Sequence, residues 1–77
     1  MQATTVDVAA TGRAIENLME TKNITVKEMQ GLLGFTTPQA IYKWIRGTAM
    51  PTIDNMVILA EMFDVTVDEI IAVDMID

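Results

Sequence analysis

Helix-start signals recur four times along this chain, and they constrain its fold more than any other feature. Thr25-Val-Lys-Glu28 and Thr66-Val-Asp-Glu69 have the capping-box pattern, in which the threonine hydroxyl and the glutamate carboxylate each satisfy the other residue's free backbone amide. Thr37-Pro38 and Pro51-Thr52 add two starts, because threonine caps helices and proline fits their first turn. The pattern predicts a chain cut into short helices.

Stop signals and apolar spacing place five helices. Thr11 is expected to open the first, which stops near Asn23, and Gly34 and Gly47 end the second and third because glycine adopts the left-handed C-cap conformation easily. The third helix spans residues 38–46, the fourth runs from 53 to about 63, and the fifth follows Thr66. Neither strand alternation nor internal repeats are present. We expect an all-α fold, a compact five-helix bundle, with an N-terminal extension (1–11), one domain (12–73) and a short tail (74–77).

Composition excludes several kinds of site. The 77 residues include no cysteine and no histidine, which rules out disulfide scaffolds, thiolate zinc sites, imidazole bases and cysteine nucleophiles. The carboxylates of Asp64, Asp68 and Glu69 lack a nucleophile partner and do not fit a calcium loop. We expect no enzyme, no catalytic or metal-binding residue and no cofactor, and no small-molecule site is evident. Without a signal-peptide pattern or a run of ~18 apolar residues, we expect a cytoplasmic protein and no membrane partner.

The charge is distributed unevenly. The net charge is −6, but all five basic residues precede residue 48, together with four acids, whereas Thr48 onward holds seven acids and no base. A solvated acidic face explains much of the second half equally well. Electrostatic attraction to a polyanion is therefore expected from the first half.

One polar stripe lies on the third helix. Gln39, Tyr42, Lys43 and Arg46 follow the i, i+3, i+4, i+7 spacing, while Ile41, Trp44 and Ile45 would face the core. A polar stripe is ordinarily only the solvent-exposed side of a helix. This one contains no carboxylate, although the protein is acid-rich, and glutamine, lysine and arginine are the side chains that read base edges. It also follows another short helix through a glycine-containing turn, as in DNA-binding helix-turn-helix motifs.

The order of these features resembles the Cro and phage-repressor type of helix-turn-helix domain, the XRE family of bacterial transcriptional regulators. The matching elements are the Thr25–Glu28 helix start, the Leu33-Gly34 turn, a recognition helix ending at Trp44 and Gly47, Pro51 before an apolar helix, and Val65-Thr-Val-Asp-Glu69. With the first helix included, the resemblance covers about residues 12–73. It implies a sequence-specific DNA-binding transcriptional regulator, expected to be a repressor that occupies an operator.

The resemblance also assigns roles to residues. Gln39 and Lys43 stand where base-reading side chains are usual, and Tyr42 and Arg46 where base-flanking or phosphate contacts are expected. The phosphate-binding positions are Thr25, Lys27, Thr37 and Thr48.

Two further positions differ from the pattern of many family members. In those proteins, an arginine of the first helix pairs with a glutamate that follows the aromatic residue of the recognition helix. Here the two positions are Met19 and Ile45. Replacing both charges by packed apolar residues is often neutral or stabilising. We therefore expect Met19 and Ile45 to touch across the core.

Apolar residues exceed what one core stripe needs. In the fourth helix, Ile53, Met56, Val57, Ala60 and Phe63 form the expected core stripe. Further apolar residues fall partly off it or in the tail: Ile58, Leu59, Met62, Ile70, Ile71, Val73, Met75 and Ile76. They either wrap a core on several sides or form a C-terminal homodimer surface, which would suit the reading of a palindromic operator in double-stranded DNA. The alternative function is a protein-interaction module, an antitoxin or anti-regulator on the same fold with weak or no DNA binding.

Overall fold

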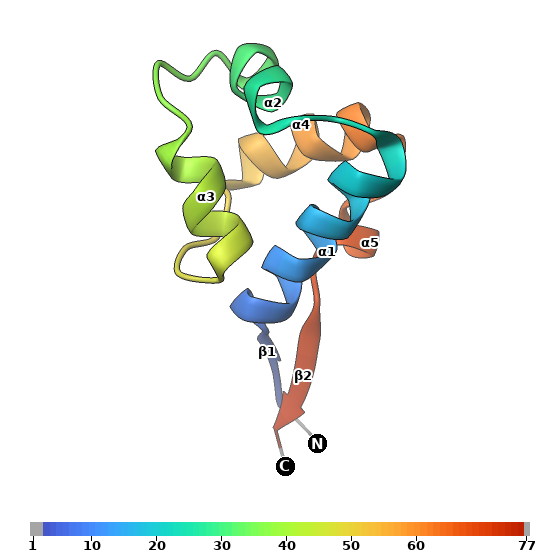
Figure 1. Cartoon of the computed structure of the whole chain (residues 1–77). Helices are drawn as coiled ribbons and strands as arrows, with labels where there is room; N and C mark the ends of the chain where they lie inside the picture. The colour runs from blue at the N-terminus through green and yellow to red at the C-terminus, as the bar shows by residue number, and fades with distance from the viewer. Residues whose placement is uncertain (1–2, 77) are drawn as a thin grey trace.

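Five helices make up most of the computed structural model, which describes residues 3–76 (Figure 1). The helices are α1 (Val8–Lys22), α2 (Val26–Leu33), α3 (Gln39–Arg46), α4 (Ile53–Phe63) and α5 (Val67–Ile70), and two short strands, β1 (Ala3–Val6) and β2 (Val73–Ile76), flank them. The predicted five-helix bundle is confirmed, with a minor sheet added. None of the helices in the described part of the chain is long and apolar enough to cross a membrane.

The two strands were not expected from the sequence. They pair antiparallel, with Ala3 opposite Ile76 and Val6 opposite Val73, and the ribbon extends away from the helices in Figure 1. Neither four-residue strand, Ala-Thr-Thr-Val or Val-Asp-Met-Ile, alternates strictly between polar and apolar residues, and the partners lie at opposite ends of the chain. The segments expected to be an extension and a tail are therefore joined to each other. The domain limits at residues 12 and 73 stay a prediction.

The predicted start of the first helix at Thr11 is wrong. Helix α1 begins at Val8, and its N-cap is Asp7, whose Oδ1 accepts a hydrogen bond of 2.9 Å from the Ala10 amide. Thr11 is instead inside the helix, only 1% exposed, and its hydroxyl oxygen accepts a 3.0 Å hydrogen bond from the Ala72 amide. The threonine therefore connects α1 to the segment that leads into β2, rather than starting the helix.

The other helix starts follow the predicted positions more closely than the predicted hydrogen bonds. The Thr25 hydroxyl oxygen accepts from the Glu28 amide at 3.1 Å, but the hydroxyl then donates to the Glu28 carboxylate, which replaces the second half of the predicted capping box. Thr52 caps α4 through the Asn55 amide. Thr66 is the N-cap of α5, yet its side chain makes no capping hydrogen bond, so the second capping box is wrong in this respect.

All five helices contribute to the core, and the core corrects the predicted face of α4. Met56, Ala60 and Phe63 are buried as expected, but Ile53 is 77% exposed, Val57 is 47% exposed, and Leu59 is fully buried. Since α4 is apolar on nearly every side, periodicity could not identify the inward face. The core residues of the described chain are Ile15, Met19, Met29, Ile41, Trp44, Met56, Leu59, Ala60, Phe63 and Ile70.

Candidate nucleic-acid interface

Helix α3 separates its apolar and polar residues onto opposite faces. Ile41 is fully buried and Trp44 is 4% exposed, so both anchor the helix in the core. The four residues of the predicted polar stripe are all exposed: Gln39, Tyr42, Lys43 and Arg46. Ile45, expected in the core, is only half-buried and packs at its margin. Core packing therefore fixes which way the polar stripe faces.

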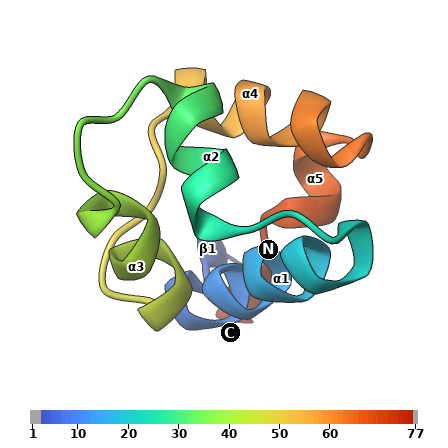
Figure 2. The same ribbon diagram turned by 45° about the horizontal axis from the view of Figure 1, so that its top comes forward.

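The backbone of α1 lies directly against the C-terminal half of α3. A Cβ atom added to Gly12 would lie 2.8 Å from the Ile45 carbonyl oxygen and even closer to that of Trp44. At the next turn, a Cβ on Gly47 would lie 2.6 Å from the Cα atom of Ala9. Gly47 also adopts a positive φ of 74°, the left-handed conformation predicted for this C-cap. These close approaches hold α3 in place against α1 (Figure 2).

The turn between α2 and α3 is anchored at Phe35. Gly34 ends α2 with φ 71°, as predicted, and the ring of Phe35 then packs edge-on against Trp44 with centroids 5.8 Å apart. Helix α3 starts one residue later than expected, because Pro38 occupies the N-cap position and its carbonyl oxygen accepts from the Tyr42 amide at 3.2 Å. Thr37 therefore does not cap α3, contrary to the prediction, and no side chain takes that role.

The predicted phosphate-binding residues surround α3 on neighbouring segments. Thr25 and Lys27 are exposed at the start of α2. Thr37 is exposed in the turn between α2 and α3, and Thr48 is exposed just after α3. Two of the three hydroxyl groups already have local partners: Thr25 donates to Glu28, and Thr48 donates to the Lys43 carbonyl oxygen at 3.2 Å. Within the described part of the chain, the side chains of Lys27 and Thr37 make no comparable hydrogen bond.

The exposed face of α3 carries two bases, Lys43 and Arg46, and no acid. The Arg46 guanidinium carbon lies 5.7 Å from the centroid of the Tyr42 ring, a cation–π arrangement. The acidic helix α5 lies across the molecule from α3 in both views (Figures 1 and 2). The polar stripe is therefore separated from the acids of α5.

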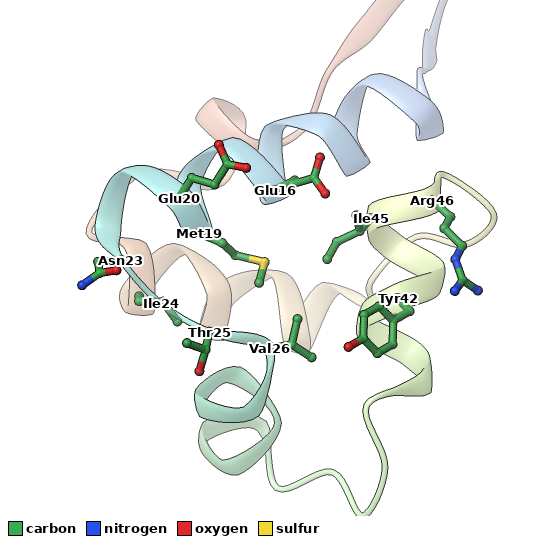
Figure 3. A pocket seen from close by; sticks show the side chains of 10 residues that line it. All are labelled: Glu16, Met19, Glu20, Asn23, Ile24, Thr25, Val26, Tyr42, Ile45 and Arg46. Carbon is green, nitrogen blue, oxygen red and sulfur yellow. The ribbon is translucent and has the colours of Figure 1, made fainter.

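Met19 and Ile45 lie on facing walls of a cavity of about 380 Å³ between α1, the start of α2 and α3. Figure 3 shows the two side chains pointing toward one another across it. They share one environment, as the sequence indicated, while direct contact between them stays a prediction. Sequence reasoning did not reveal this cavity, whose lining comes from three separate segments.

A family model described as helix-turn-helix matches residues 15–70 of the chain. The chain belongs to the helix-turn-helix family. The resemblance to the Cro and phage-repressor type is confirmed, and with it the assignment as a DNA-binding transcriptional regulator. Nothing in this regulatory family assignment points to an enzyme.

The fold is shared with a solved structure, the restriction-modification controller protein C.AhdI from Aeromonas hydrophila. The two are 20% identical, with a TM-score of 0.73, and the match covers 83% of this chain and 96% of the other. Comparison with curated proteins finds no match. At this identity the structural likeness supports the helix-turn-helix fold.

Proposed function

We propose that this helix-turn-helix protein is a bacterial cytoplasmic repressor that reads a palindromic operator with α3. The observation that carries the proposal is the exposed, carboxylate-free face of α3, formed by Gln39, Tyr42, Lys43 and Arg46, opposite the buried Ile41. A helix of this kind fits the major groove of B-DNA, where each base pair presents a distinct pattern of donors and acceptors.

Base reading is assigned to two residues of this face. The Gln39 amide can pair with adenine through N6 and N7, and the Lys43 ammonium can donate to guanine O6 or N7. Tyr42 and Arg46 flank them, and their stacked arrangement holds a guanidinium ready for a base edge or phosphate. The four side chains therefore divide into two readers and a flanking pair.

Phosphate contacts are assigned to the residues around α3. The first amides of α3 have no side-chain cap, so they and the Thr37 hydroxyl can donate to a phosphate. Lys27 adds charge at the start of α2. Thr25 and Thr48 would exchange their present hydrogen bonds with Glu28 and the Lys43 carbonyl for bonds to phosphate. These contacts fix the position of the helix without reading sequence.

A homodimer formed through the C-terminal apolar surface is part of the proposal. With only five basic residues, a monomer can neutralise few phosphates and would bind weakly. Val73 in β2 is 56% exposed and its partner Val6 is 43% exposed, and a two-stranded ribbon is marginally stable alone in water. Covering these valines with a second copy would place two α3 helices on one operator.

The test is the selection of bound sequences from a random double-stranded DNA pool at two salt concentrations. We expect an inverted repeat to be enriched, with weaker retention at the higher salt concentration. Enrichment of no sequence, together with no salt-dependent retention, would contradict the proposal. That outcome would favour the second candidate, a protein-interaction module, which the 77% exposure of Ile53 and the 64% exposure of Leu32 support.

A further inference from the structure

The cavity beside α3 includes neither of the two proposed base-reading residues, Gln39 and Lys43. Its volume of about 380 Å³ falls within the range of ~300–1,000 Å³ that is usual for small-molecule sites. It opens between α1 and α3, and its third wall is the beginning of α2 (Figure 3). Three segments that are far apart in the sequence therefore form one hollow next to the recognition helix.

The lining has an apolar part and an acidic part, and the neutral polar side chains of Asn23, Thr25 and Tyr42 complete it with Arg46. Met19, Ile24, Val26 and Ile45 supply apolar surface, and apart from the weakly accepting sulfur of Met19 their side chains have no hydrogen-bonding group. Glu16 and Glu20, both exposed on α1, add two acidic residues at the solvent-exposed rim of the cavity. A ligand that complements both parts has an apolar body and a positively charged group.

The lining contains only one base, Arg46. Its guanidinium group is stacked over Tyr42, and in Figure 3 it points away from the cavity. The two carboxylates are therefore not neutralised by the cavity's own cation. This charge balance disfavours an anionic ligand and favours a cationic one.

We propose that this cavity binds a small organic cation with an apolar body, an amphipathic amine, which acts as a co-repressor. The binding site depends on the cavity alone, whereas the co-repressor role rests on the proposed function. The apolar body lies between Met19 and Ile45, and the ammonium group lies at Glu16 and Glu20. Tyr42 and Arg46 line the same cavity, so the amine sits beside proposed DNA-binding side chains.

The sign of the coupling follows from charge. Glu16 and Glu20 repel a phosphate backbone that approaches Thr25, Tyr42 and Arg46, because all five residues line one hollow. A bound ammonium group offsets that repulsion, so the amine tightens DNA binding. By linkage, DNA tightens amine binding by the same factor.

Direct binding is tested without DNA, using phenethylamine as the probe. In an NMR titration of the whole chain, the amide signals of Met19, Val26 and Ile45 should shift along a saturable curve that is half complete at about 10 mM or below, the weakest dissociation constant expected for so few atoms. The neutral 2-phenylethanol and the anionic 3-phenylpropionate should bind about fivefold more weakly. Equal binding of amine and alcohol, or no saturable shift at these residues, would overturn the site.

A charge-removing variant sharpens this test. The double variant Glu16→Gln/Glu20→Gln should reduce amine affinity to that of the alcohol and leave the alcohol unchanged, while Glu61→Gln, an exposed glutamate of α4 outside the cavity, should change neither. Amide spectra without ligand establish that each variant is folded. Unchanged amine affinity in the folded double variant would contradict the assigned carboxylates.

The co-repressor role is tested separately by operator titration with and without phenethylamine. We expect the amine to tighten binding about fivefold and the double variant to lose this effect. Amine binding without any change in operator affinity would overturn the co-repressor role while retaining the site. Absence of operator binding in amine-free buffer would contradict the proposed function. The amine site would still stand, because the titration without DNA does not depend on operator binding.

Discussion

Gly12 lies so close to Trp44 that a methyl group cannot be placed between them without a shift of the backbone. The added Cβ would meet the Trp44 carbonyl oxygen first and the Ile45 carbonyl oxygen at 2.8 Å. Both oxygens belong to the backbone of α3, which cannot yield as a flexible side chain would. The position of the recognition helix therefore depends on the absence of a side chain in α1.

Replacement of Gly12 or Gly47 by alanine should destabilise the fold. We expect each change to lower the free energy of unfolding by about 1–3 kcal/mol, because both add a methyl group to a filled space and Gly47→Ala also forces alanine into a positive φ. Urea denaturation followed by Trp44 fluorescence measures this. Gly31→Ala is the matched control, since its Cβ would meet nothing within 4 Å, and it should be neutral or stabilising by up to about 1 kcal/mol. Equal effects at all three glycines would contradict the close approach.

Loss of the Thr11 hydroxyl should loosen the attachment of the ribbon. Thr11→Val keeps the shape but leaves the Ala72 amide without its acceptor, which should cost about 1–3 kcal/mol. Hydrogen exchange should accelerate at Ala72 in particular. Thr21→Val, at an exposed position of the same helix, should change stability by less than about 0.5 kcal/mol. A protected Ala72 amide in the Thr11 variant would show that this bond is not needed.

Acid should weaken the start of α1. The hydrogen bond from the Ala10 amide, assisted by the charge of Arg13, lowers the pKa of Asp7 below its ordinary value, although partial desolvation acts in the opposite direction. Because the folded-state pKa is the lower one, the stabilisation is present above the unfolded-state pKa of about 3.9 and is lost as the pH falls through the folded-state value. Denaturation curves of wild type and Asp7→Asn should therefore converge as the pH is lowered below about 4. A constant difference between them down to about pH 2, where even a carboxyl with a lowered pKa gains protons, would count against this assignment.

Removal of a base-reading side chain should change sequence preference as well as affinity. Gln39→Ala and Lys43→Ala should each weaken operator binding by about 1–3 kcal/mol and relax selection at one base pair of each half-site. Fluorescence anisotropy with operator and single-substituted duplexes measures both effects. Lys22→Ala removes the same charge from an exposed position at the end of α1 outside the proposed contacts, so it should leave base preference unchanged. Wild-type operator binding by both α3 variants would end the assignment.

The helices and the face of α3 could be predicted because their signals are local. Glycine at residues 34 and 47 adopts a left-handed conformation whatever packs against it, and the spacing of Ile41 and Trp44 defines one inward side of a short helix. The start of α1 was misplaced because Asp7 and Thr11 are both acceptable caps by residue type. Only the hydrogen bond from Ala72, which is 61 residues away, shows why Thr11 lies within the helix.

The order of residues along the chain was enough to establish the number and succession of the helices, their glycine stops and the carboxylate-free stripe on α3. Three features emerged only when the chain was folded: the pairing of β1 with β2, the burial of Leu59 in place of Ile53, and the cavity between α1 and α3. The difference lies in the range of the interactions. Caps and helical periodicity act within a few residues, whereas strand pairing, the choice of buried face on an all-apolar helix and the shape of a hollow depend on segments that meet only after folding.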